Sequence, residues 1–205
     1  MLVRFVLWFA WLGFISLLLL TLLGGATFAG YSHLSQFISE LGATGAPREH
    51  LIRFAGFLPT GVFMCLFAAG AFVALPRSPV KALALVGVVL YAMGYVAAAF
   101  FPCDPGCRPP QPSLSQVIHN LVGLVGYLLA PLFLLAFGVA ARRWPGGGFL
   151  AVASFVCAAF TLVGMLTLSP QSSYAGVSQR VIETSVWVWV IICAWYIRSR
   201  SANSA

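Results

Sequence analysis

The sequence contains very few charged side chains. Of its 205 residues, eleven are Lys or Arg and four are Asp or Glu, so charged residues make up 7% of the chain and apolar residues 61%. A soluble globular domain carries about 25% charged residues, because its surface faces water. So few charges cannot cover a soluble surface of this size, and the composition therefore excludes a soluble domain.

Long polar stretches are also missing, and apolar runs recur along the whole chain. Each run is close to the roughly 20 residues that a helix needs to cross hydrocarbon. The runs do not alternate in polarity as the strands of a transmembrane barrel do, so helices are the spanning form that satisfies the backbone. We therefore predict an all-α integral membrane bundle of six transmembrane helices, a single domain over residues 1–205. The predicted spans are 5–27, 54–75, 82–101, 117–140, 149–168 and 179–197.

The first span has an alternative interpretation as a signal peptide, because Arg4 precedes it and small residues follow it. Its apolar core is longer than the roughly 7–15 residues of a signal-peptide core, and no A-x-A cleavage site follows it. We therefore expect a transmembrane helix here.

Positively charged residues indicate the orientation. If every span crosses, seven bases fall on one side of the membrane, and the positive-inside rule assigns that side to the cytoplasm. These bases are Arg4, Arg77, Lys81, Arg142, Arg143, Arg198 and Arg200. We expect a multi-pass protein of the cell membrane with both termini cytoplasmic. The net charge of +7 is then a topology signal beside anionic lipid, and we expect membrane lipids and no nucleic acid as partners.

Acidic residues and histidines have the opposite distribution, because all of them fall in or beside the predicted outer segments. They are Glu40, Glu49, Asp104, Glu183, His33, His50 and His119. The positive-inside rule does not explain the missing inner acids, since Asp and Glu contribute little to orientation. The asymmetry therefore indicates that any chemistry lies on the outer side.

The first outer segment has helical periodicity. Apolar residues recur at positions 34, 37, 38 and 41, Ser32 suits an N-cap, and Gly42 suits a helix end. We predict a short outer interfacial helix with its apolar face toward the membrane. Glu40 would then lie near the unfavourable C-terminal end of the helix dipole and would need a basic partner. The alternative is that Glu40 is a solvated surface acid.

The second outer segment, Phe101–Pro110, contains four prolines and a glycine and is not expected to be helical. Its Cys103 and Cys107 would lie in an oxidising compartment, so we predict a disulfide between them, which would fix the backbone around Asp104. Redox activity is the alternative. The three other cysteines lie within spans and are expected to be packing residues.

Six residues are candidates for one outward-facing pocket: Ser39, Glu40, Asp104, His119, Arg180 and Glu183. Unpaired charges at the margin of hydrocarbon cost several kcal/mol, so we expect the charged members to converge. The expected geometry pairs Arg180 with Glu40 or Glu183, with His119 facing the same cavity. A local ion pair between Arg180 and Glu183, which are three residues apart on one helix face, is the alternative.

The run Ile38–Pro47 resembles the signature of a prokaryotic multi-pass family catalogued as domain of unknown function 998. The resemblance continues in Gly61, in Phe101–Pro102, in His119, and in Arg180 with Glu183. Cys103, Cys107 and His33 are not general features of that family. The resemblance implies six helices and no established activity, cofactor or catalytic residue.

Three functional hypotheses remain open at this level. The first is binding of a lipid or small amphiphile, which needs a few oriented polar groups in an apolar cleft. The second is a membrane hydrolase, with or without a metal, acting at the outer face on a lipid or lipid-linked substrate; the sequence lacks a His-x-x-x-His motif near its last spans, and we assign no metal ligands. The third is a structural or assembly partner. The sequence does not define the oligomeric state.

Overall fold

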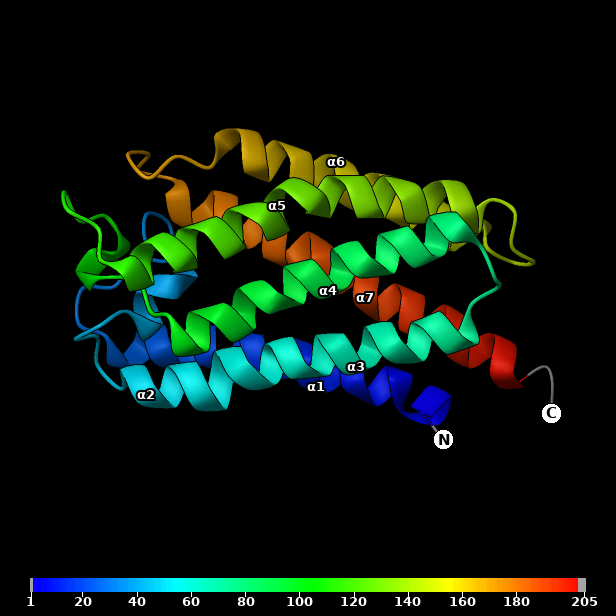
Figure 1. Cartoon of the computed structure of the whole chain (residues 1–205), viewed down its shortest axis with the longest axis horizontal. Helices are drawn as coiled ribbons and strands as arrows, with labels where there is room; N and C mark the ends of the chain where they lie inside the picture. Colours follow the sequence, from blue (N-terminus) through cyan, green and yellow to red (C-terminus); the bar gives the residue numbers. More distant parts are fainter. Residues whose placement is uncertain (1, 203–205) are drawn as a thin grey trace.

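The computed structural model describes residues 2–202 as a bundle of long, roughly parallel helices (Figure 1). Six helical spans are long and apolar enough to cross a membrane, and no strand occurs within residues 2–202. The first span is α1 (Leu2–Thr27). The second is one continuous rod made of α2 (Glu49–Ile52), the π-helical turn η2 (Arg53–Phe57) and α3 (Leu58–Ala74).

The remaining spans are α4 (Pro79–Phe100), α5 (Leu114–Ala141), α6 (Gly148–Thr167) and α7 (Ala175–Ala202). The chain ascends and descends in turn, so that α1 packs on α3 and α7, and α4, α5, α6 and α7 pack on one another in sequence order. This arrangement confirms the predicted six-helix fold.

The start of α1 and the end of α7 lie at the same end of the bundle (Figure 1). The connections 28–48, 101–113 and 168–174 lie at the opposite end, which we call the site end. Two short 3-10 helices, η1 (Ile38–Gly42) and η3 (Pro105–Cys107), belong to these connections. The acids and histidines therefore gather at or near the site end.

Several predicted span boundaries differ from the structure by a few residues, and among the starts of the spans two differ most. The second span begins at Glu49 rather than residue 54, and the sixth begins at Ala175 rather than residue 179. The prediction began the second span after Arg53 and the sixth just before Arg180, whereas residues 49–53 and 175–178 also belong to these helices. Glu183 consequently lies about 12 Å beyond the start of α7, at 1.5 Å per residue, and not at the margin of the helix.

The first outer segment forms a shorter helix than its periodicity indicates. Turns occupy residues 33–35, and only Ile38–Gly42 is helical. In this segment, side-chain oxygens accept backbone hydrogen bonds that carbonyls would accept in a helix. Gln36 Oε1 accepts from the Ser32 backbone N–H at 2.8 Å, and Glu40 Oε1 accepts from the Phe37 backbone N–H at 2.9 Å. Glu40 thus serves the N-terminal end of η1, which corrects its expected place at a C-terminal end.

Small residues allow the helices to approach closely. A β-carbon at Gly61 of α3 would lie 2.8 Å from the carbonyl oxygen of Ala92 in α4. The core between the helices is filled by large side chains, among them Trp187, Trp189 and Phe67, which are fully buried. Close packing of this kind stabilises helices in hydrocarbon, where apolar burial gives little driving force.

Candidate functional site: a buried carboxylate beside a cavity

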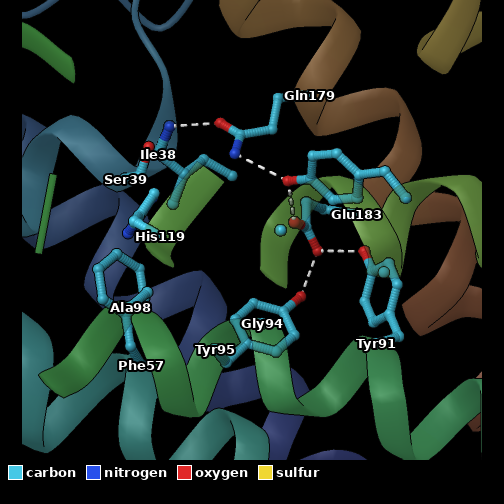
Figure 2. A pocket seen from close by; sticks show the side chains of 13 residues that line it. Ile38, Ser39, Phe57, Tyr91, Gly94, Tyr95, Ala98, His119, Gln179 and Glu183 are labelled. Carbon is cyan, nitrogen blue, oxygen red and sulfur yellow. Dashed lines mark hydrogen bonds between the residues drawn. The ribbon is translucent and has the colours of Figure 1, made fainter. Parts of the chain in front are cut away.

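Glu183 lies inside the bundle and accepts three tyrosine hydrogen bonds. Its side chain comes from α7 and the residue is 6% exposed. Tyr91 and Tyr95 of α4 donate to Oε2, the former at 2.6 Å, and Tyr127 of α5 donates to Oε1 at 2.7 Å. A buried carboxylate needs such partners, because a charge in a low-dielectric interior is costly when unpaired. The three hydroxyls therefore hold α4, α5 and α7 together around one acidic group (Figure 2).

The network extends from Glu183 in two directions. Gln179, one helical turn earlier, donates from Nε2 to the Tyr127 hydroxyl at 2.8 Å and accepts at Oε1 from the Ile38 backbone N–H at 2.6 Å. On the other side, Trp187 Nε1 donates to the Tyr95 hydroxyl at 3.0 Å. The carboxylate is thus tied through Gln179 to the first connection of the site end.

A cavity of about 60 Å³ lies beside this network. Its wall includes Ser39, His119 and Glu183, and also the small residues Gly94 and Gly123, which face each other across α4 and α5. Both glycines are partly exposed. A space of this size holds a few water molecules or one small polar group.

His119 presents one ring nitrogen as a hydrogen-bond acceptor. Its Nδ1 lies 3.0 Å from the backbone carbonyl of Phe101, and a carbonyl can only accept, so Nδ1 carries a proton. In the neutral ring Nε2 is then an acceptor. The same connection is also held by Ser115, whose hydroxyl donates to the carbonyl of Pro102 at 2.7 Å. The Phe101–Pro102 pair thereby positions the start of α5.

Arg180 does not pair with either acid expected for it. Its guanidinium donates to the carbonyls of Gln36 and Gly176, each at 3.0 Å, to the Tyr31 hydroxyl at 2.8 Å and to His33 Nδ1 at 3.0 Å. It therefore fastens α7 to the first connection through neutral acceptors. The predicted ion pair was wrong because backbone carbonyls, which sequence reasoning did not consider, take up the guanidinium.

Glu40 is 4% exposed, so it is not a solvated surface acid. Its partners are Gln36, whose Nε2 donates at 2.8 Å, and Arg108, whose Nη2 lies 3.4 Å from Oε1. Arg108 comes from the second connection, so this pair joins two connections of the site end. Glu40 does not line the cavity.

Asp104 also has a local structural role. Its Oδ2 accepts from the Ser113 backbone N–H at 2.9 Å, while its own N–H donates to Gln116 Oε1 at 2.8 Å. The disulfide between Cys103 and Cys107 is present, as predicted. The Ser39 hydroxyl lies 3.6 Å from the sulfur of Cys107, so the disulfide packs against the segment that carries Ser39.

Three of the six candidates, Ser39, His119 and Glu183, line one cavity, whereas Glu40, Asp104 and Arg180 do not line it. Sequence reasoning missed Tyr91, Tyr95, Tyr127 and Gln179. A signal was available, since Tyr91 and Tyr95 are four residues apart on one helix face and a buried tyrosine hydroxyl needs a partner. Within residues 2–202, no group of three His, Cys, Asp or Glu side chains is placed to hold a metal ion.

The fold and this network define a multi-pass helical membrane protein with an acidic, tyrosine-lined cavity near one end of the bundle. Residues 11–196 match the family described as "Protein of unknown function (DUF998)", and the chain belongs to that family. Comparison with curated proteins and with solved structures gave no match. The family assignment confirms the resemblance of Ile38–Pro47, and the function has to be argued from the site itself.

Proposed function

We propose that this protein binds an amphiphile whose hydroxyl- or amine-bearing head lies in the cavity beside Glu183. The observation that carries the proposal is the chemistry of the cavity wall. Two hydrogen bonds occupy Glu183 Oε2 but only one occupies Oε1, so Oε1 keeps a free lone pair. His119 Nε2 is a second acceptor, and Ser39 adds a hydroxyl. A wall of acceptors selects a ligand that donates.

The remaining wall suits the apolar part of the same ligand. Gly94, Gly123, Ala98 and Phe57 present only small or apolar surface to the cavity. Because the two glycines are partly exposed, a hydrocarbon tail has a path between α4 and α5 into the bilayer. Pockets that combine a few oriented polar groups with apolar walls are typical of small-molecule sites. The asymmetric distribution of bases supports the outer leaflet as the source of the ligand.

Hydrolysis is less well supported than binding. A serine nucleophile needs a base within hydrogen-bond reach. Ser39 contacts the sulfur of Cys107 instead, and no hydrogen bond joins it to His119 within the described residues. We therefore propose binding as the function and keep outer-face hydrolysis as the alternative. In the experiment below, hydrolysis would consume the ester ligand.

The test is a titration of purified protein with three ligands that share one chain: glycerol monooleate, oleylamine and methyl oleate. The first two donate hydrogen bonds from their heads and methyl oleate cannot. We expect the first two to raise the melting temperature in a saturable way, because ligands that bind the folded state stabilise it. Equal effects of all three would contradict the proposal, and mass spectrometry of the recovered ligand reports hydrolysis.

A matched pair of variants locates the site. A β-carbon at Gly123 meets nothing within 4 Å, and the same holds for Gly148 at the far end of the bundle. Gly123→Leu should fill the cavity and abolish the response to glycerol monooleate, whereas Gly148→Leu should leave it unchanged. Neither variant should unfold the protein, since leucine is favoured over glycine in a helix by about 1 kcal/mol. Binding that persists in Gly123→Leu would exclude this cavity.

A further inference from the structure

A second space opens on the other side of α7, between α7 and α1. It has a volume of about 320 Å³. Phe14, Leu17, Leu18 and Leu22 of α1 form its apolar wall, and Leu18 and Leu22 are 41% and 52% exposed, so this groove opens sideways to the hydrocarbon. Arg180 and His33 line the groove near the site end. One end of the groove is therefore basic and the rest is apolar.

Arg180 forms no direct ion pair with a carboxylate within the described residues. The two ion pairs found within residues 2–202 are His50 with Glu49 and Arg108 with Glu40. Four N–H groups of Arg180 are used by neutral acceptors, and its Nε–H has no acceptor in the described part of the chain. Neutral acceptors satisfy the hydrogen bonds of this guanidinium, so its charge is offset only through space, by Glu183, and not by a direct ion pair.

His33 adds a second donor to the same end. Because a guanidinium can only donate, His33 Nδ1 accepts from Arg180, and in the neutral ring the proton is on Nε2. Burial and the positive charge of Arg180 both lower the pKa of His33, which favours the neutral ring. The ring lies against α1 at Gly25, where a β-carbon would be 2.7 Å from Nε2. The basic end of the groove thus offers N–H donors together with a net positive charge.

Glu183 also lines this groove, but its carboxylate is directed elsewhere. All three of its hydrogen-bond donors belong to α4 and α5, and none belongs to α1. The polar groups of the groove and of the cavity are therefore complementary to opposite chemistries. The cavity presents acceptors, and the groove presents donors at Arg180 and His33.

We infer that the groove between α1 and α7 binds a membrane phospholipid with an anionic headgroup. The phosphodiester lies at Arg180 and His33, and one acyl chain lies along Phe14, Leu18 and Leu22. The guanidinium charge, which no direct ion pair offsets, selects a net negative lipid over a zwitterionic one. The exposed leucines select a lipid over a free anion, because inorganic phosphate would gain nothing from an apolar wall. This site does not rest on the proposed function of the cavity.

Native mass spectrometry of detergent-solubilised protein tests the inference, with phosphatidylglycerol, phosphatidylcholine and inorganic phosphate as separate probes. A single basic residue near a membrane surface contributes about 1 kcal/mol to anionic-lipid binding, so we expect about fivefold tighter binding of phosphatidylglycerol than of phosphatidylcholine. Equal affinity for the two lipids would overturn the inference. Binding of inorganic phosphate as tightly as phosphatidylglycerol would overturn it in favour of a free anion.

Two leucines of α1 provide matched variants. Leu18 lines the groove, whereas its neighbour Leu19 is 49% exposed and does not. Leu18→Trp should fill the groove and remove the preference for phosphatidylglycerol, and Leu19→Trp should keep it. Arg180→Gln should also remove the preference, and if that variant does not fold the leucine pair decides alone. Equal binding by both tryptophan variants would contradict the site. Gly123→Leu should keep the preference, so failure of the cavity and failure of the groove are distinguishable.

Discussion

Glu183 Oε1 accepts a hydrogen bond of 2.7 Å from the hydroxyl of Tyr127, and this bond joins α7 to α5 inside the bundle. Tyr127 is also the acceptor for Gln179, which holds the backbone of Ile38. One tyrosine therefore connects the buried carboxylate to the first connection of the site end. The stability of this end and the shape of the cavity depend on the same bond.

Tyr127→Phe should destabilise the protein. The change leaves one oxygen of Glu183 without its donor and Gln179 Nε2 without its acceptor, and each unsatisfied buried polar group costs about 1–3 kcal/mol. Thermal unfolding in detergent should show a clear fall in melting temperature. Tyr174, which is 64% exposed, provides the control, since Tyr174→Phe removes a hydroxyl that faces outward. If the two variants melt at the same temperature, the network around Glu183 contributes no stability.

Acidification should weaken the attachment of the first connection to α7. Burial and Arg180 lower the pKa of His33 below its ordinary value of about 6.5. The stability contributed by neutral His33 is therefore complete above that value, and it is lost as the pH falls through it toward the lowered pKa of the folded state. The protonated ring would also repel Arg180.

The measurement is the melting temperature between pH 8 and pH 5 for the wild type and His33→Asn, which keeps an uncharged acceptor. We expect the acid-induced fall to be smaller in the variant. A fall of the same size in both proteins would show that His33 does not control it. The other two histidines are unchanged in this pair, so their contributions cancel in the comparison.

The sequence predicted the six helices well, because long apolar runs leave few alternatives in a membrane. It predicted that Ser39, His119 and Glu183 lie toward the same end of the bundle, since topology alone groups them. It did not predict the tyrosines around Glu183 or the carbonyl partners of Arg180. Apolar runs specify where a helix is but not which face meets which neighbour, and backbone acceptors have no sequence signature.

The orientation of the bundle remains a prediction that labelling can test. The seven bases at the end opposite the site favour the cytoplasm for both termini. Ser199 and Ser173 are exposed residues at opposite ends of the bundle. In intact cells, a membrane-impermeant thiol reagent should modify Ser173→Cys and should modify Ser199→Cys only after the cells are opened. Modification of Ser199→Cys alone in intact cells would reverse the orientation, and modification of both would break the six-span topology.

The central claim is that an amphiphile places its donor-bearing head beside Glu183, and photo-crosslinking tests it most directly. The probe is glycerol monooleate with a diazirine on the acyl chain close to the glycerol, and the adducts are mapped by mass spectrometry after proteolysis. We expect adducts on α4 and α5 within residues 91–98 and 119–127, with competition by unlabelled glycerol monooleate and loss of the adducts in Gly123→Leu. Adducts confined to the lipid-facing surface of α6, unchanged in Gly123→Leu, would contradict the account.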